Sequence, residues 1–173
     1  MGSSTLFRGL CLGLLAVAAC GWRAGLPVPA GARSIGVEVS TREGQVLERG
    51  LEPELTAALS QAVVDWIDLP LVAPDQADLV LRSEVVDYRR RGGVRNTENE
   101  LIETAIFVRA RAELYDRRSG RVIEGPRLAQ EWSGFALDAA VPSEEEAQTR
   151  VLRHVAAALV LELFGGRDGN EPE

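Results

Sequence analysis

The chain has 173 residues, of which 46% are hydrophobic and 26% charged, enough apolar material for one globular domain. Its formal net charge is −7, and all 19 basic residues are arginine. Because binding to nucleic acids needs a basic surface that displaces counterions, this acidic balance argues against a general nucleic-acid-binding protein.

Residues 1–19 have the anatomy of a secretory signal, with Arg8 ahead of a short apolar segment. A membrane-spanning helix needs about 20 apolar residues, and this segment is shorter. It ends in Val17-Ala18-Ala19-Cys20, which resembles a bacterial lipobox, where the signal is cut before the cysteine and that cysteine is acylated. The alternative is an ordinary signal peptide with a chance cysteine. We expect the lipoprotein.

Cys20 is the predicted lipidation site, since Cys11 lies inside the signal and no second mature cysteine remains for a disulfide. A durable anchor needs more than one acyl chain, which a lipobox cysteine typically carries. Gly21 stands where many enterobacterial inner-membrane lipoproteins have aspartate, so the sequence predicts the outer membrane. Trp22 either sits at a membrane or barrel rim or packs on the domain.

Residues 20–33 are predicted to form the lipidated N-terminus and a linker, because they are rich in glycine and proline. The domain is expected over residues 34–166. Its first strand, 34–40, alternates apolar and polar residues. Its first helix, 52–66, has Pro53 in the first turn. The apolar stripe of this helix recurs at spacings of three and four and comprises Leu51, Leu55, Ala58, Leu59, Ala62, Val63 and Trp66.

Three more strands are predicted, at 78–89, 102–115 and 122–135, the last interrupted near Gly125-Pro126. The third strand of the chain alternates most clearly. One of its faces carries Ile102, Thr104, Ile106, Val108, Ala110, Ala112 and Leu114. The other carries Glu103, Ala105, Phe107, Arg109, Arg111, Glu113 and Tyr115.

The last helix is predicted to begin at Ser143, which forms a capping box with Glu146, and to end at Gly165-Gly166. Residues 167–173 are expected to be a disordered acidic tail. The order β-α-β-β-β-α predicts an α+β fold in which two helices cover one face of a four-stranded mixed sheet and leave the other open. The predicted core includes Leu59, Trp66, Ile106, Val108, Val155 and Leu159.

No catalytic motif appears in the sequence. His154 is the only histidine and is expected at or near the helix surface. Residues 144–146 are three glutamates that could bind a cation, although their place at a helix start explains them. Phosphate-binding glycine loops, metal-spaced clusters and nucleophile triads are missing. The sequence therefore predicts no enzyme, no cofactor and no metal.

Arginines concentrate in two places. Arg89, Arg90, Arg91 and Arg95 are expected at one hairpin tip, and Arg109 and Arg111 on the outward face of the next strand. One interpretation is a solvated turn beside a charged strand. The other is a binding site for an anionic ligand, because guanidinium groups bind phosphates and carboxylates as bidentate forks.

The sequence resembles the lipopolysaccharide (LPS)-assembly lipoprotein family (LptE) of Gram-negative outer membranes. The likeness is a pattern of spacing over nearly the whole mature chain. It is carried by Cys20-Gly21-Trp22-Arg23, Leu26-Pro27, the strand at residues 35–39, Leu55-x-x-x-Leu59, Ala77-Asp78-Leu79-Val80-Leu81, the long hairpin and the closing amphipathic helix.

This resemblance implies a non-enzymatic protein, anchored in the outer membrane, that sits inside a large LPS-inserting β-barrel (LptD-like). It would help the barrel fold and assist incoming LPS. Segments at residues 79–81 and 116–122 also look like lipoprotein activators of a peptidoglycan synthase. That activator is the alternative function, and neither interpretation identifies the partner or its stoichiometry.

Overall fold

The computed structural model describes residues 25–93, 95–99, 103–136 and 143–166. The signal peptide, Cys20, Trp22 and the acidic tail lie outside these residues. The described chain has the predicted α+β fold. Its elements in order are β1 (Ile35–Val37), β2 (Thr41–Arg42), α2 (Leu51–Trp66), β3 (Leu79–Arg91), β4 (Glu103–Asp116), β5 (Arg121–Ala136) and α3 (Glu144–Phe164).

The strands form one mixed sheet in the order β1-β3-β4-β5. β1 and the two-residue strand β2 both pair with β3 in parallel. β4 pairs antiparallel with β3 and with β5. The sheet thus has five strands where the sequence predicted four. β2 is too short to show the alternation that marks a strand, which is why its residues looked like a connection.

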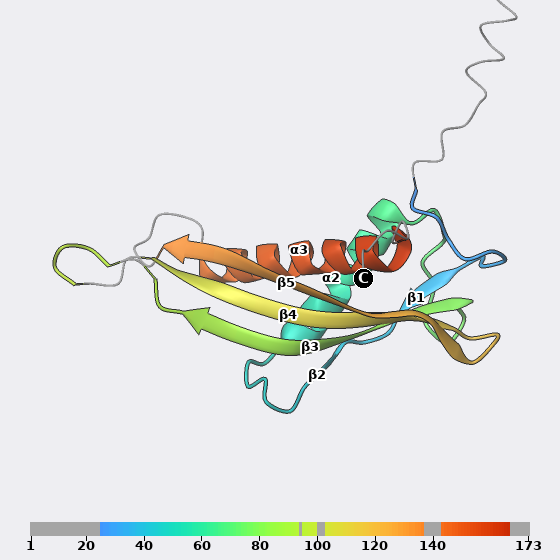
Figure 1. Cartoon of the computed structure of the whole chain (residues 1–173), viewed down its shortest axis with the longest axis horizontal. Coiled ribbons are helices and arrows are strands. Elements are labelled where there is room, and N and C mark those ends of the chain that lie inside the picture. Colours follow the sequence, from blue (N-terminus) through green and yellow to red (C-terminus); the bar gives the residue numbers. More distant parts are fainter. Residues whose placement is uncertain (1–24, 94, 100–102, 137–142, 167–173) are drawn as a thin grey trace, which may run out of the picture.

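Both helices cover one face of the sheet, and the other face is open (Figure 1). α3 packs on β4 and β5, while α2 packs on α3 and on the β1 and β3 side. The described residues of the predicted inward face of β4 are all buried, from Thr104 to Leu114. Ile102 lies outside the described residues.

The core lies between the helices and this sheet face. Leu59, Ile106, Val108, Val155 and Leu159 are buried there, as predicted. Trp66 was also predicted in the core, and this is wrong, because it is 45% exposed. α2 ends at Trp66 and the chain turns to an extended conformation at Ile67. The side chain of Ile67, buried in the core cluster, therefore takes the place that helical spacing assigns to Trp66.

The capping box of α3 forms as predicted. The Glu146 backbone N–H donates to Ser143 Oγ (3.2 Å), and the Ser143 N–H donates to Glu146 Oε2 (2.8 Å). These bonds satisfy two of the N–H groups that a helix start leaves free. Among the described helices, neither is both apolar and long enough to cross a membrane.

β3 contains a bulge that changes which residues face the helices. Val85 pairs with Ala110 and Asp87 with Arg109, so that Val86 is an extra residue between two consecutive pairs. An extra residue on one strand shifts the alternation of all side chains that follow.

After the bulge, Tyr88 and Arg90 share the helix side, and Arg89 and Arg91 share the open side. Tyr88 is partly buried and packs against the core, and its hydroxyl lies 3.4 Å from Gln148 Oε1 on α3. Without the bulge, regular alternation from Val85 would place Arg89 and Arg91 towards the helices.

β5 runs through the Gly125-Pro126 position where an interruption was predicted, although its pairing with β4 shifts register there. Gly125 has a φ of +99°, and a Cβ at this position would lie 2.8 Å from the carbonyl oxygen of Ala112. Only glycine fits both constraints.

A small polar network is buried between the sheet and α2. Ser40 Oγ lies 2.6 Å from Ser83 Oγ and 3.1 Å from Thr56 Oγ1 on α2, whose hydroxyl donates to the Glu52 carbonyl oxygen (2.6 Å). The Ser40 N–H donates in turn to Thr56 Oγ1 (2.9 Å). The network holds the segment between β1 and β2 against both β3 and α2.

Candidate functional site

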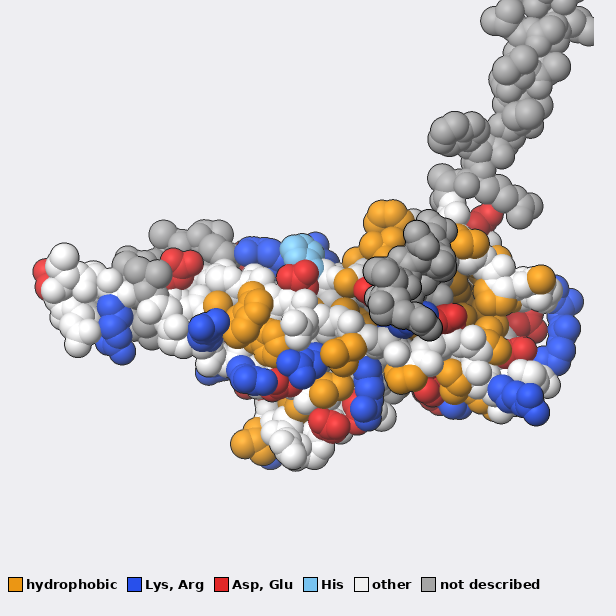
Figure 2. Space-filling view, in the orientation of Figure 1, with side chains coloured by type: hydrophobic (Ala, Val, Ile, Leu, Met, Phe, Trp, Pro, Cys, Tyr) orange, Lys and Arg blue, Asp and Glu red, His pale blue; other side chains and the backbone are white. Residues whose placement is uncertain are grey.

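The open face of the sheet carries the arginines of β3 and β4 among aromatic side chains. In the space-filling view, basic and hydrophobic side chains alternate over the strands (Figure 2). Neither helix of the described residues covers this face. Two regions with different chemistry lie along it.

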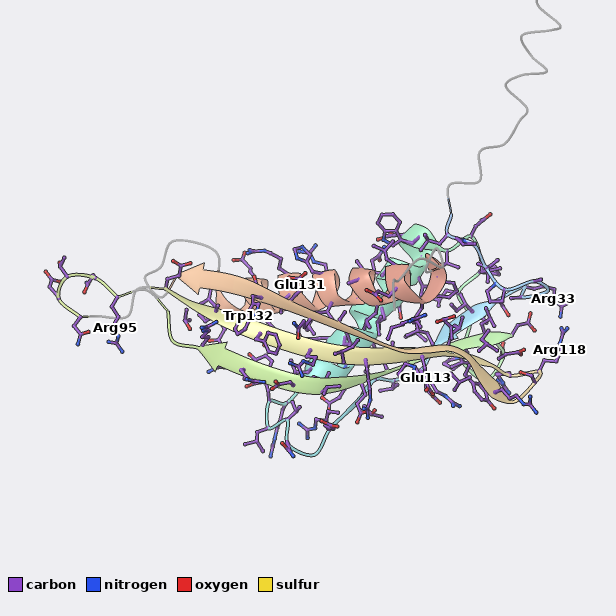
Figure 3. The ribbon with its side chains drawn as sticks, in the orientation of Figure 1. Arg33, Arg95, Glu113, Arg118, Glu131 and Trp132 are labelled. Carbon is purple, nitrogen blue, oxygen red and sulfur yellow. The ribbon has the colours of Figure 1, made fainter. Side chains whose placement is uncertain are left out.

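The first region, here called the distal patch, lies near the hairpin end of β3, β4 and β5. It consists of Phe107, Trp132, Arg89, Arg91 and Arg109. Phe107 and Trp132 pair across the strands with ring centroids 4.4 Å apart and a tilt of 40° between the rings. Phe107 is only 4% exposed although it points away from the core, whereas Trp132 is 45% exposed. Figure 3 shows Trp132 lying over the sheet.

The arginines of the distal patch stack around these rings. The guanidinium carbons of Arg89 and Arg109 lie 5.5 and 5.7 Å from the centre of the Phe107 ring, and that of Arg91 lies 5.4 Å from Trp132. Cation–π contacts at this range attract the guanidinium to the ring face. Stacking also fixes side chains that would otherwise lose rotamer freedom on binding a ligand. The three cations are therefore held in place before any ligand arrives.

One acidic side chain lies within the distal patch. Asp87 forms an ion pair with Arg89, and this hydrogen bond holds the pKa of the Asp87 carboxyl below its usual value of 3.8. Asp87 is thus ionised at neutral pH. Arg109 donates to Gln130 Oε1 (3.2 Å), a neutral group that leaves its charge in place. Glu103 lies on the same face, four residues nearer the hairpin end than Phe107. Three cations thus surround a patch with one internal carboxylate.

The second region, here called the proximal groove, lies over the other half of the sheet and encloses about 430 Å³. Its charges are paired. Arg82 Nε donates to Glu38 Oε2 (2.9 Å), and Arg111 Nε donates to Glu84 Oε2 (2.8 Å). The guanidinium carbon of Arg82 lies 4.0 Å from the Tyr115 ring centre. The charged side chains that line it are Glu38, Arg82, Glu84, Arg111 and Glu113. This groove has more carboxylates than guanidinium groups.

The six predicted arginines therefore do not form one cluster. Arg89, Arg91 and Arg109 meet in the distal patch, and Arg111 belongs to the proximal groove. Arg90 lies on the helix side, 2.5 Å from Glu144 Oε1 on α3 and 3.8 Å from Glu48 Oε2. Arg95 lies in the loop beyond the sheet and donates to the Asn99 carbonyl (2.6 Å; Figure 3).

Sequence reasoning did not single out Trp132 or Phe107 as site residues. Phe107 stood on the predicted outward face of its strand, and Trp132 lies opposite it. The available sequence signal was an apolar ring, Phe107, beside Arg109 and Arg111 on the predicted outward face. The pairing register that brings the two rings together is not visible in the sequence of either strand.

Other candidates have ordinary surroundings. His154 is exposed on α3, and Glu144, the first residue of that helix, pairs with Arg90. Within the described parts of the chain, no group of three or more His, Cys, Asp or Glu side chains is arranged to hold a metal ion. The chemistry that the distal patch offers is the binding of anionic groups beside an aromatic surface.

No family model and no curated protein matches the chain. The fold is similar to that of several solved bacterial structures. A minor lipoprotein from Acinetobacter baumannii is 20% identical with a TM-score of 0.46 over 80% of this chain and 96% of its own. The PelC dodecamer protein of Paraburkholderia phytofirmans is 16% identical with a TM-score of 0.47 over 84% and 95%.

A lipoprotein from Neisseria meningitidis is 12% identical with a TM-score of 0.45, over 78% of this chain and 99% of its own. Likenesses of this size transfer neither a ligand nor a partner to the chain.

Proposed function

We propose that this protein is a non-enzymatic lipoprotein, acylated at Cys20 and anchored in the outer membrane. In this proposal its open sheet face contacts LPS within an LPS-inserting β-barrel (LptD-like). The single observation that carries the proposal is the distal patch, where three arginines lie against two aromatic rings on the sheet face opposite α2 and α3.

The chemistry of the distal patch suits this ligand. The sugar head of LPS carries phosphate groups next to acyl chains. Guanidinium groups bind phosphates through paired, charge-assisted hydrogen bonds. Trp132 offers an exposed apolar surface beside those guanidinium groups, at 45% exposure. The distal patch can therefore contact the phosphate groups with its arginines and the adjacent apolar part of the ligand with Trp132.

The direct test is to titrate purified LPS into the wild type and into the double variant Arg91→Glu/Arg109→Glu. A hydrogen bond to a charged group contributes about 1.5–3 kcal/mol, so losing two such contacts should weaken binding by at least about a hundredfold. The matched control is Arg121→Glu/Arg153→Glu, which changes the net charge equally at two exposed arginines outside the patch. The control should bind LPS like the wild type.

A second experiment tests the partner. Affinity isolation of the lipidated protein, followed by mass spectrometry, should recover a large outer-membrane β-barrel, and recovery should fall for Arg91→Glu/Arg109→Glu. Recovery of a peptidoglycan synthase in place of a barrel would overturn the proposal in favour of the activator function. Equal LPS affinity of the two double variants would show that the distal patch does not bind LPS.

A further inference from the structure

Trp66 is an exposed tryptophan at the last residue of α2 that the proposed ligand surface does not use. It is 45% exposed. Val64 on α2 and Leu161 on the last turn of α3 are also exposed. The C-terminal ends of both helices lie at the end of the molecule where the chain enters the domain (Figure 1). Trp66 thus presents an apolar ring at this end of the molecule.

The chain enters the domain directly against Trp66. The Leu26 N–H donates to the Trp66 carbonyl oxygen (2.9 Å), and Leu26 itself packs against the core. A Cβ on Gly25 would lie 3.2 Å from the Asp68 Cβ and 3.6 Å from the Trp66 carbonyl oxygen. The first described residues are therefore fixed to the end of α2.

The distance from this point to the predicted lipid anchor is short. Five residue steps separate Cys20 from Gly25, and an extended chain reaches at most about 3.6 Å for each step, or about 18 Å. β4 alone, with 14 residues, spans roughly 45 Å. An acyl group on Cys20 thus holds the Trp66 end of the molecule close to the bilayer.

We infer that the end of the domain that carries Trp66 lies on the membrane surface, with the Trp66 ring among the lipid head groups. The inference rests on the proposed acylation of Cys20. Tryptophan prefers this layer because its ring is amphipathic. Asp65 and Asp68 flank Trp66 and repel anionic lipids, so the occupant is a zwitterionic bilayer surface. The distal patch then points away from the anchoring bilayer.

Two single-tryptophan variants of the full lipidated chain test the inference, since the sequence has three tryptophans. Trp22→Phe/Trp132→Phe keeps Trp66, and Trp22→Phe/Trp66→Phe keeps Trp132. Each is reconstituted into phosphatidylcholine vesicles with and without brominated acyl chains, which quench tryptophan only at short range. Trp66 emission should shift to the blue and be strongly quenched, while Trp132 emission should stay unchanged.

The outcomes separate this inference from the proposed function. If the protein does not float with the vesicles, Cys20 is not acylated, and both the anchor and the inference fall. If it floats but Trp66 is no more quenched than Trp132, the anchor stands and the inference is overturned. Quenching of Trp132 would also overturn it, because the open face would then lie on the bilayer. The Cys20→Ser chain, which lacks the acyl group, should show no quenching.

Discussion

The two faces of the sheet are made by alternate residues of the same strands but do different work. The helix side of β4 presents Ile106, Val108 and Ala110, all fully buried. The open side presents Phe107, Arg109 and Arg111 in the same stretch. Phe107 shows the difference best, because it is buried by arginines and Trp132 and not by a helix. Burial on one side stabilises the fold, and on the other it orders charged groups.

The largest effect that distinguishes the faces should come from the core. Leu159→Ala on α3 removes a fully buried side chain and should lower the free energy of unfolding by about 2–5 kcal/mol. Leu128→Ala on the open face, where the leucine is 53% exposed, is the control and should change stability by about 0.5 kcal/mol or less. Urea unfolding of both variants measures this, and equal losses would contradict the assignment of the faces.

A smaller effect is expected from the buried polar network. Ser83→Ala removes the partner 2.6 Å from Ser40 Oγ, but the Ser40 hydroxyl keeps Thr56 Oγ1, 3.1 Å away, as an acceptor. We therefore expect a loss of about 1 kcal/mol, the net value of one hydrogen bond. Thermal and urea unfolding would check this value. A variant as stable as the wild type would show that the network adds nothing to the packing of α2 on β3.

Arg90 and Arg91 are neighbours on opposite faces, so they sharpen the comparison. Arg90→Glu places a third carboxylate beside Glu48 and Glu144 and should cost up to about 1 kcal/mol of stability. Arg91→Glu lies in the distal patch and should leave stability unchanged while weakening LPS binding. Unfolding and LPS titration of both single variants provide the measurement. The reverse pattern would mean that Arg90, and not Arg91, lies on the open face.

The smallest effect concerns Asp87 and its pH dependence. Its pKa is lowered in the folded protein, so the Asp87–Arg89 pair contributes stability above the usual value of 3.8, and this contribution is lost as the pH falls through the folded pKa. Asp87→Asn should cost a few tenths of a kcal/mol, about the size of an exposed ion pair. In urea titrations the difference from the wild type should shrink below pH 3.8 and vanish once the pH is below the lowered pKa of the folded protein. The variant should also bind LPS more tightly.

Much of the fold follows from periodicity. The capping box at Ser143, the inward face of β4 and the helix order were predicted because each depends on residues close in the sequence. Trp66 failed because spacing of three and four does not say where a helix stops, and α2 stops there. The choice between Trp66 and Ile67 for the core is made by the turn that follows.

The candidate site was harder to predict for a related reason. The chemistry of six arginines was visible, but their grouping depends on pairing between strands. Arg109 joins Arg89 because of the β3–β4 register, and Trp132 joins Phe107 because of the β4–β5 register. Strand alternation separates Arg90 from Arg89 and Arg91, and the bulge at Val86, which no residue type marks, decides which face each of them takes. The sequence therefore shows which arginines are present, but only the pairing of the strands shows which of them lie together.

The bulge at Val86 determines which charged side chains of β3 lie on each face of the sheet. A related chain that lacks this one residue would keep Arg89 and Arg91 outward on a regular ladder. A chain that retains it but pairs it one-to-one would turn both arginines inward and expose Arg90. A homologue with a single gap at this position therefore keeps the charge of the open face, whereas a chain of full length without the bulge would invert it. The surface charge thus depends on how one residue of the strand is paired.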